Sequence, residues 1–339
     1  MKIALDAMGG DLAPATVVEG SVQALRSYSD IEELFLVGDE PQIRHEFRRF
    51  GALDPRVTFV HASQIISMSD GAVEGVRRKK DSSVSRAVDL VKEGRAQAVV
   101  SAGHTGAAVA ATTIKLRMLD GIERPGIATT MPTEKNLFVL IDAGANIEAK
   151  PVHLLQYGIM GSLYSKHVLG FKNPRVGLMS IGEEDVKGND LTKDTFKLLE
   201  RSTLNFVGNV EGHDVFEGKV EVIVCDGFVG NVVLKTAESL ATALFRWLKV
   251  ELTRTPIRKA GALLARDAFN HIRRRTDYAE YGGAPLLGVN GTCIICHGAS
   301  SPKAIANAIR VARQTISNQL TSHIVTEVRL NHERLQAKN

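Results

Sequence analysis

The sequence predicts an α/β fold, a three-layer α/β/α sandwich built around a largely parallel sheet. The first observation behind this prediction is a series of short, almost continuously apolar runs, which is typical of strands that are buried on both faces. The second is that segments with helical spacing of apolar residues lie between most of these runs. No linker rich in Pro, Gly or Ser divides the chain, so we expect a single domain over residues 1–339.

The strands are predicted from the apolar runs, and the helices from the segments between them. The predicted strands are KIALDAM (2–8), ELFLVG (33–38), RVTFVHA (56–62), AQAVVSA (96–102), NLFVLIDAG (136–144), RVGLMSIG (175–182), VEVIVCDG (220–227) and GTCIICHG (291–298). The predicted helices are 15–28, 84–94, 106–118, 151–169, 191–200 and 302–320.

Composition excludes several classes of protein. The net charge of +4 and the aromatic content of 5% give no basis for binding nucleic acid. Three cysteines are too few for a disulfide framework and suit a reducing compartment. Met1 and Lys2 lead directly into an apolar strand, and no apolar run reaches the roughly 18 residues of a membrane span. We therefore expect a cytoplasmic protein without a signal peptide.

Polar, glycine-rich loops follow the predicted strands. In an open parallel sheet, ligands bind beyond the carboxyl ends of the strands. Glycines let backbone N–H groups approach a ligand, and helix N-termini favour anions. The loops at these ends are DAMGGD (6–11), SAGHTG (101–106), DAGAN (142–146), IGEEDVKGND (181–190), CDGFVGN (225–231) and HGASSP (297–302).

Two of these loops share a G-x-x-G spacing, Gly103 with Gly106 and Gly227 with Gly230. Each pair follows an apolar run and opens a helix, so we expect both to face an anion such as phosphate. Neither loop has the spacing of a dinucleotide fingerprint or of a P-loop. The residues predicted to bind phosphate or substrate are Asp6, Gly9, Gly10, Gly103, His104, Thr105, Gly106, Asn146, Gly227, Gly230 and His297.

Two further side chains are candidates for catalysis. Lys187 lies beside a glycine in a strand-end loop, where it is either a mobile charge for phosphate or a solvated lysine. Asn231 is placed either to donate to a developing oxyanion or to cap a helix. Cys293 and Cys296 point to opposite faces of one strand, which disfavours a shared metal. We expect no metal and no cofactor, and a reaction in which phosphate itself is the nucleophile.

A basic, amphipathic helical hairpin is predicted over 240–280. Residues 246–275 contain nine Lys or Arg and two acidic residues, a net charge of +7. Leu240, Leu244, Leu248 and Leu252 form one apolar stripe, and a second stripe follows Pro256. Such a hairpin suits an anionic membrane surface or an acidic protein, a dimer contact, or a solvated arm. The residues predicted to make this contact are Arg258, Lys259, Leu263, Leu264, Arg273, Arg274 and Arg275.

Taken together, the motifs resemble one family, the acyl-acyl carrier protein:phosphate acyltransferases of bacterial phospholipid synthesis. The resemblance rests on DAMGGD, RRKKDSS (77–83), SAGHTGA, DAGAN, QYGIMGS (156–162), IGEEDVKG, CDGFVGN and GTCIICHGA, which run in the family's order from residue 6 to about residue 300. One departure is His104, where the family usually has Asn.

The resemblance implies a fold like that of phosphotransacetylase and the isopropylmalate dehydrogenase group. It implies reversible transfer of a long-chain acyl group from acyl carrier protein to inorganic phosphate, without a covalent enzyme intermediate. It also implies a homodimer that attaches to the inner face of the cell membrane and supplies the acyl phosphate:glycerol-3-phosphate acyltransferase. The family's functional lysine and asparagine fall on Lys187 and Asn231.

Three other functions fit part of the pattern. A small-acyl phosphotransacetylase that uses coenzyme A would share the fold. An isopropylmalate-type dehydrogenase would need paired aspartates for a metal and a nucleotide site, and neither is clear in the sequence. A non-catalytic membrane scaffold would use the hairpin alone.

Overall fold

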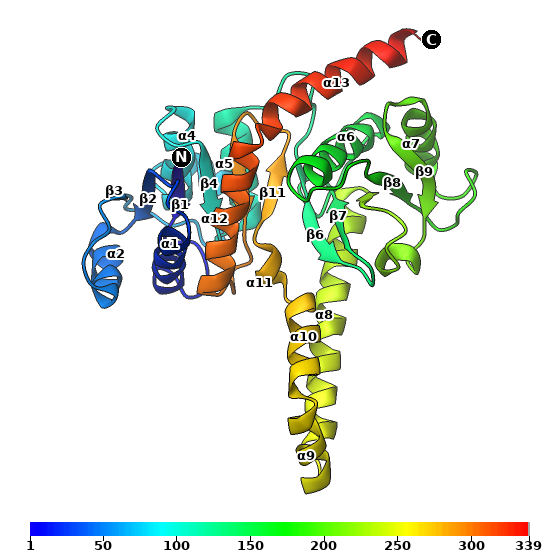
Figure 1. Cartoon of the computed structure of the whole chain (residues 1–339). Helices are drawn as coiled ribbons and strands as arrows, with labels where there is room; N and C mark the ends of the chain where they lie inside the picture. Colours follow the sequence, from blue (N-terminus) through cyan, green and yellow to red (C-terminus); the bar gives the residue numbers. More distant parts are fainter. Residues whose placement is uncertain (338–339) are drawn as a thin grey trace.

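The computed structural model describes residues 1–337. It confirms the predicted α/β class, with helices on both faces of mostly parallel sheets (Figure 1). The strands form two sheets, whereas the sequence pattern predicts one, because apolar periodicity identifies strands but not their hydrogen-bonded neighbours.

The first sheet has seven strands in the order β3-β2-β1-β4-β12-β11-β5. Its first five strands pair in parallel, and β11 pairs antiparallel with both of its neighbours. The bounds are β1 Lys2–Asp6, β2 Glu33–Gly38, β3 Val57–His61, β4 Ala98–Ser101, β5 Gly126–Ile127, β11 Ala284–Leu287 and β12 Thr292–Ile295.

The second sheet has five strands in the order β6-β7-β10-β8-β9, and only β6 is antiparallel. The bounds are β6 Thr129–Pro132, β7 Leu137–Ile141, β8 Arg175–Met179, β9 Asn205–Val210 and β10 Val222–Val224. Asp142, directly after β7, joins the two sheets, because its Oδ1 accepts a hydrogen bond of 2.9 Å from the amide of Ile127 in β5.

Helices cover both faces of the first sheet, with apolar side chains packed onto it. One face carries α1 (Ala15–Ser27), α2 (Glu40–Phe47) and α12 (Pro302–Ser317), and the other carries α3 (Ala72–Arg78), α4 (Ser83–Lys92) and α5 (Thr105–Leu116). One face of the second sheet packs against α6 (Pro151–His167), α7 (Asp190–Arg201) and α13 (Leu320–Ala337). The first turns of α8 (Gly227–Leu252) cover its other face.

Successive side chains along each strand point to opposite faces of the sheet, which explains these layers. In β7, Val139 and Ile141 face the core below α6, whereas Phe138 and Leu140 face the core below α8. In the same way, Cys293 and Cys296 belong to cores on opposite faces of the first sheet, as the sequence predicts. Because both faces of these strands are buried, the strands appear in the sequence as unbroken apolar runs.

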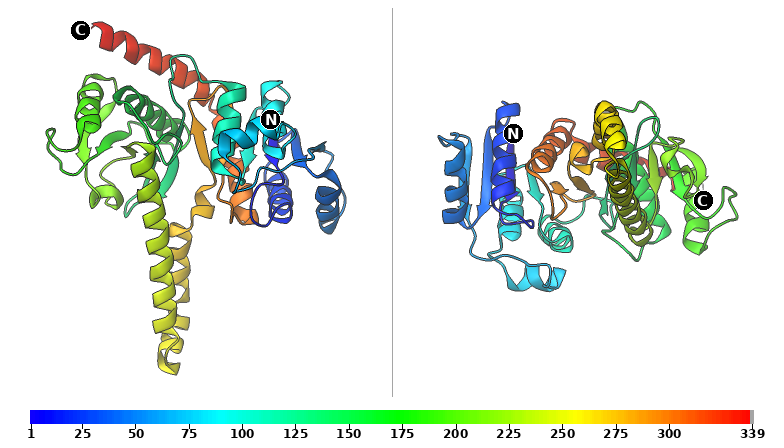
Figure 2. Two further views of the ribbon diagram at one scale, coloured as in Figure 1. Left: turned by 180° about the vertical axis from the view of Figure 1, so that it is seen from behind. Right: turned by 90° about the horizontal axis from the view of Figure 1, so that it is seen from below.

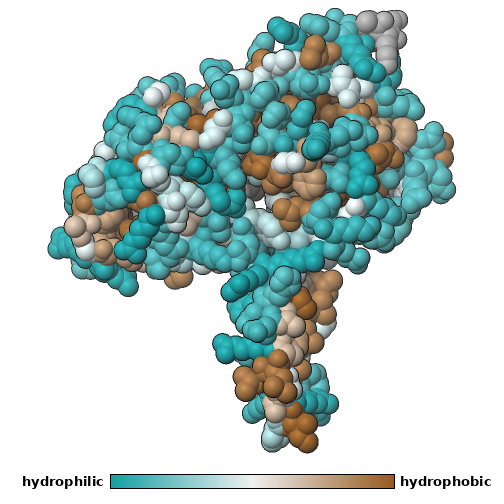
Figure 3. Space-filling view, viewed as in Figure 1, coloured by the Kyte–Doolittle hydropathy of each residue, from teal (hydrophilic) through white to brown (hydrophobic). Residues whose placement is uncertain are grey.

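The predicted hairpin over 240–280 corresponds to the outer part of α8 together with α9 (Pro256–Leu264) and α10 (Arg266–Thr276). The two arms lie side by side and project from the body as a narrow rod (Figures 1 and 2). Apolar residues run along this rod to its tip (Figure 3), where Leu264 is 90% exposed and Ile257 is 85% exposed. A short helix, α11 (Tyr278–Tyr281), returns the chain to β11. Among residues 1–337, no helix is both long and apolar enough to cross a membrane.

Every predicted strand and helix is present, with ends that differ by a few residues. The sequence pattern misses β5, β6, β9 and β11, which are short or interrupted by glycine, proline or polar residues. It also misses α2, α3, α11 and α13 and two single turns, Arg48–Phe50 and Asp214–Phe216.

Candidate active site

The loops after β1, β4 and β12 meet at one edge of the first sheet. Asp6 ends β1 and accepts a hydrogen bond of 2.7 Å from the hydroxyl of Ser101, which ends β4. Burial raises the pKa of the Asp6 carboxyl, against the opposing effect of hydrogen bonds from Ser83 and Ser101. A Cβ on Gly9 would lie 2.6 Å from the amide nitrogen of Gly103, so this close approach requires glycine.

The loops after β1 and β4, together with residues 65–68 and the start of α4, enclose a cavity of about 180 Å³ in which many of the predicted residues meet. The predicted residues among those that line it are Asp6, Gly9, Gly10, Gly103 and His104. His104 is the N-cap of α5, and its Nδ1 accepts a hydrogen bond of 3.2 Å from the amide of Ala107. Asn, the residue that the resemblance implies at this position, is also a good N-cap residue, so His104 can fill the same local role.

The corresponding edge of the second sheet is organised by Asp142. This buried carboxylate accepts hydrogen bonds from the amides of Ile127, Gly144, Ala145 and Asn146, at 2.7 to 3.0 Å. Burial raises its pKa, and these four donors oppose that effect. The loop DAGAN is therefore held rigidly against the start of α8.

The backbone amides at the start of α8 already donate to acceptors within the protein. The prediction that Gly227 and Gly230 face an anion is therefore wrong. The amide of Gly227 donates to the carbonyl oxygen of Asn146 at 2.9 Å, and that of Gly230 donates to the carbonyl oxygen of Asp226. The Asp226 carboxylate caps the two amides between them. Gly227 and Gly230 are needed for close packing instead, because a Cβ on Gly230 would lie 1.9 Å from the carbonyl oxygen of Asp142. Their backbone amides do not form a second anion cradle.

Asn146 also has a structural role, since its side-chain amide donates to the hydroxyl of Tyr157 at 3.1 Å. Asn231, by contrast, is not a helix cap, because Asp226 occupies the N-cap position of α8. The Asn231 side chain lies in the second turn of α8 next to Gly144 and lines a cavity between the two sheets.

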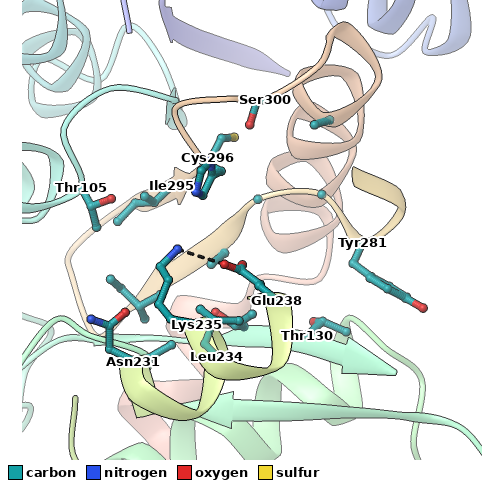
Figure 4. Close-up of a pocket in the computed structure, with 18 residues that line it drawn as sticks. Thr105, Thr130, Asn231, Leu234, Lys235, Glu238, Tyr281, Ile295, Cys296 and Ser300 are labelled. Atoms are coloured by element: carbon teal, nitrogen blue, oxygen red, sulfur yellow. Dashed lines mark hydrogen bonds and ion pairs between the residues drawn. The ribbon is translucent and has the colours of Figure 1, made fainter. Parts of the chain in front are cut away.

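This cavity, called here the inter-sheet cleft, has a volume of about 150 Å³ (Figure 4). Its residues come from α5, α8, α12 and the strands between them. Thr105, Asn231 and His297, all predicted, line it together. Thr105 and Gly106 are also the first two residues of α5, where amide N–H groups have no acceptor within the helix. The N-terminus of α5 thus lies between the 180 Å³ cavity and the inter-sheet cleft.

Several residues of this cleft were not predicted from the sequence, above all Lys235, Glu238 and Ser300. Lys235 and Glu238 form an ion pair with 3.0 Å between Nζ and Oε2. Asn231, Lys235 and Glu238 follow one another at i, i+4 and i+7 on α8, so their shared helix face was a signal available in the sequence. Ser300 stands within the recognised loop HGASSP, but nothing in its spacing distinguishes it from Ser301.

Lys187 lies apart from the other predicted residues. It is exposed on the loop between β8 and α7 and does not line either cavity. Its strand, β8, neighbours β10, whose end leads directly into α8. Lys187 and Asn231 therefore stand at the same edge of the second sheet, one strand apart.

The cysteines are unsuited to nucleophilic chemistry. Cys296 lines the inter-sheet cleft, but burial raises its pKa to about 12, and burial raises that of Cys293 to about 11. Cys225 is also buried, and its pKa is raised. Because thiolates and not thiols attack carbonyl carbons, none of the three is an activated nucleophile.

Within residues 1–337, a possible metal-binding group is formed by Glu183, His213 and Asp214. The amine of Lys219 pairs with Asp214 and lies 3.9 Å from a carboxylate oxygen of Glu183. A lysine in this position already balances the negative charge that would attract a cation.

The predicted contact residues of the hairpin are divided between its two ends. Arg258, Lys259, Leu263 and Leu264 lie on α9 at the tip, whereas Arg273, Arg274 and Arg275 lie at the root. Arg275 donates to the carbonyl oxygens of Thr133 and Glu134 and so anchors the root to the body. The seven residues therefore do not form one contact surface, because the tip group and the root group lie at opposite ends of the hairpin.

Comparison with known proteins places the chain in a family. The profile of the family described as "Fatty acid synthesis protein" matches residues 1–323. A relative from Pelotomaculum thermopropionicum named "Phosphate acyltransferase" is 52% identical over 328 residues, which cover 97% of this chain and 95% of the relative. The chain belongs to the fatty acid synthesis protein family. This member is an enzyme, an acyltransferase that acts on phosphate.

Solved structures support the fold of this family member. A phosphotransacetylase from Streptococcus pyogenes has a TM-score of 0.61 at 17% identity, covering 95% of this chain and 94% of that one. A 4-hydroxythreonine-4-phosphate dehydrogenase from Klebsiella pneumoniae has a TM-score of 0.50 at 14% identity, covering 95% and 99%. At these identities the likeness concerns the fold alone, and it agrees with the predicted relation to phosphotransacetylases and dehydrogenases.

Proposed function

We propose that this enzyme transfers a long-chain fatty acyl group from acyl carrier protein to inorganic phosphate, yielding acyl phosphate and free carrier protein. The observation that carries the proposal is the match over nearly the whole chain to a phosphate acyltransferase within a family described by fatty acid synthesis. The acyl phosphate serves phospholipid synthesis as the substrate of an acyl phosphate:glycerol-3-phosphate acyltransferase.

The proposed reaction is a direct displacement. A phosphate oxygen attacks the thioester carbonyl carbon, a C–O bond forms, and the carbonyl oxygen becomes an oxyanion. When the C–O double bond reforms, the C–S bond breaks and the thiolate leaves with its electron pair. A thiol of pKa roughly 8.5 leaves without strong acid assistance. The high pKa values of Cys293 and Cys296 favour direct attack over an acyl-enzyme intermediate.

Three groups contribute to the chemistry. The N-terminus of α5, with Thr105 and Gly106, binds phosphate through backbone amides and the positive end of the helix. Asn231 donates its side-chain N–H to the oxyanion. Lys187, on the loop beside the end of β10, closes toward the cleft as a mobile charge. The displacement requires no cofactor.

The test is synthesis of acyl phosphate by the purified chain. Palmitoyl-acyl carrier protein and inorganic phosphate are incubated with the enzyme, and acyl phosphate is trapped with hydroxylamine as the hydroxamate. We expect product only when enzyme, thioester and phosphate are all present. A parallel series with acetyl-coenzyme A addresses the competing function. Turnover confined to acetyl-coenzyme A would replace our proposal with a small-acyl phosphotransacetylase.

We further propose that the tip of the hairpin attaches the enzyme to the anionic inner face of the cell membrane. Support comes from Ile257, Leu263 and Leu264, which are 85%, 68% and 90% exposed beside Arg258 and Lys259. Apolar insertion together with attraction to anionic lipid gives reversible binding of this kind. The exposed stripe of Leu240, Leu244 and Leu248 on α8 is available to a second copy, which suits the homodimer implied by the family.

We expect the double variant Leu263→Glu/Leu264→Glu to lose sedimentation with anionic vesicles while retaining most acyl transfer in solution, because the tip is remote from the cleft. The matched control is Val207→Glu/Leu330→Glu, which places the same charge at two exposed apolar positions on β9 and α13. Wild-type binding should fall as salt rises. Undiminished sedimentation of the tip variant would eliminate the membrane proposal. Conversion to monomers would assign the tip to the dimer instead.

A further inference from the structure

Ser300 lines the inter-sheet cleft, and its hydroxyl is buried without a hydrogen bond. Ser300 is 4% exposed, and its Oγ has no hydrogen-bond partner among residues 1–337. Buried hydroxyls in proteins are almost always paired, so an unpaired one in the wall of a cavity is available to a ligand. In Figure 4 this side chain points from the loop before α12 toward the interior of the cleft.

The surrounding loop is fixed by its own hydrogen bonds, which leaves the Ser300 hydroxyl uncommitted. The hydroxyl of Ser301 caps α12 by accepting from the amide of Ala304 at 3.3 Å. The amide of Ser300 donates to the carbonyl oxygen of His297 at 3.0 Å. Ser300 directly precedes Ser301, the N-cap of a helix of 16 residues, and so lies at the end where the helix dipole favours negative charge.

The opposite wall supplies a cation. Lys235 extends from α8 into the cleft and meets Glu238 at 3.0 Å (Figure 4). About half of the Lys235 side chain and a third of the Glu238 side chain are exposed, so this pair is accessible to solvent. Exposed ion pairs contribute little to stability, so the amine can exchange its carboxylate partner for another anion at small cost.

We infer that Ser300 and Lys235 complete the binding site for the attacking phosphate. The inference rests on the proposed function and specifies where its inorganic substrate binds. The Ser300 hydroxyl donates to one phosphate oxygen, and the Lys235 amine leaves Glu238 to pair with another. The N-termini of α12 and α5 add their partial positive charges from two sides. Phosphate is thereby placed within the same cleft as Asn231.

The first experiment compares Ser300→Ala with Ser85→Ala. Ser85 is a matched control, because it is 0% exposed and its Oγ is also unpaired, but it lies in α4 away from the cleft. Neither substitution removes a hydrogen bond within the protein, so both variants should fold. We expect Ser300→Ala to raise the KM for phosphate about tenfold, the loss of one hydrogen bond to a charged group, with a small change in kcat. Ser85→Ala should match wild type.

A second measurement needs no acyl donor. The thermal midpoint is recorded in potassium phosphate and in potassium chloride of equal ionic strength, because a ligand that binds only the folded state raises the midpoint. We expect wild type and Ser85→Ala to gain stability from phosphate, and Ser300→Ala to lose most of this gain. Equal phosphate gains in Ser300→Ala and wild type would overturn the inference.

The exchange of Glu238 for phosphate at Lys235 can be tested with two variants that should change the KM for phosphate in opposite directions. Glu238→Gln frees Lys235 and removes a carboxylate that repels phosphate, so we expect the KM for phosphate to fall severalfold. Lys235→Gln should raise it, whereas Lys249→Gln, an exposed lysine farther along α8, should not. An unchanged KM in both Glu238→Gln and Lys235→Gln would remove Lys235 from the site.

These outcomes separate the inference from the proposed function. If wild type forms acyl phosphate but Ser300→Ala has an unaltered KM for phosphate, the site is wrong and the function stands. If wild type forms no acyl phosphate while the phosphate-dependent thermal gain disappears in Ser300→Ala, the site stands and the function is wrong.

Discussion

Replacing Asn231 with Asp is expected to reduce turnover about 1000-fold, and replacing it with Ala about 100-fold, the range observed when one preorganised oxyanion donor is removed. The Asp variant should be worse because it places a negative charge where another develops. Asp226, not Asn231, caps α8, so neither change removes a helix cap. The measurement is the kcat for acyl phosphate formation by variants whose thermal midpoints match wild type.

A charge-matched control for the Asp variant is Asn173→Asp, at an exposed position between α6 and β8. It should retain wild-type kcat. Wild-type kcat in both the Ala and the Asp variants would mean that Asn231 neither donates to an oxyanion nor senses its charge.

Lys187→Ala is expected to lower turnover by at least about 100-fold with little change in stability. The side chain is exposed and does not line the cleft, so its removal should leave the packing of the fold intact. Its predicted contribution arises when the loop over 180–189 closes and brings the amine to the phosphate or the oxyanion. Steady-state kinetics and thermal unfolding of the same preparation measure the two effects.

The matched control is Lys197→Ala, an exposed lysine on α7 that pairs with Asp194 at 2.9 Å. It removes the same charge from the neighbouring surface and should leave kinetics unchanged. A folded Lys187→Ala enzyme with near-normal kcat would show that the lysine is only a solvated loop residue.

Sequence pattern predicted the layers of this fold well because burial on both faces leaves a strong signal. It could not divide the strands between two sheets, since the division depends on tertiary hydrogen bonds such as that from Ile127 to Asp142. The glycines at 227 and 230 were misread for a related reason. A G-x-x-G that opens a helix serves an anion or a close packing contact equally well, and only the neighbouring loop decides.

The candidate site was predictable where residues stand directly at strand ends. Thr105 and His297 meet because the parallel neighbours β4 and β12 end at one edge of the first sheet, and Asn231 joins them from the second sheet across the inter-sheet cleft. Ser300 escaped prediction because its distinguishing property, an unpaired buried hydroxyl, exists only in three dimensions. The separation of Lys187 from the cleft likewise depends on the path of its loop, which no local pattern specifies.

The continuity of α8 has a mechanical consequence. Asn231 and one arm of the hairpin belong to one unbroken helix of 26 residues, which ends at Leu252 just before the tip helix α9. At 1.5 Å per residue this helix is a rod of ~39 Å. A tilt of ~5° at its seated end would displace the far end by ~3 Å, by simple leverage over that length. Any tilt of α8 at the cleft would therefore be carried along the arm toward the tip.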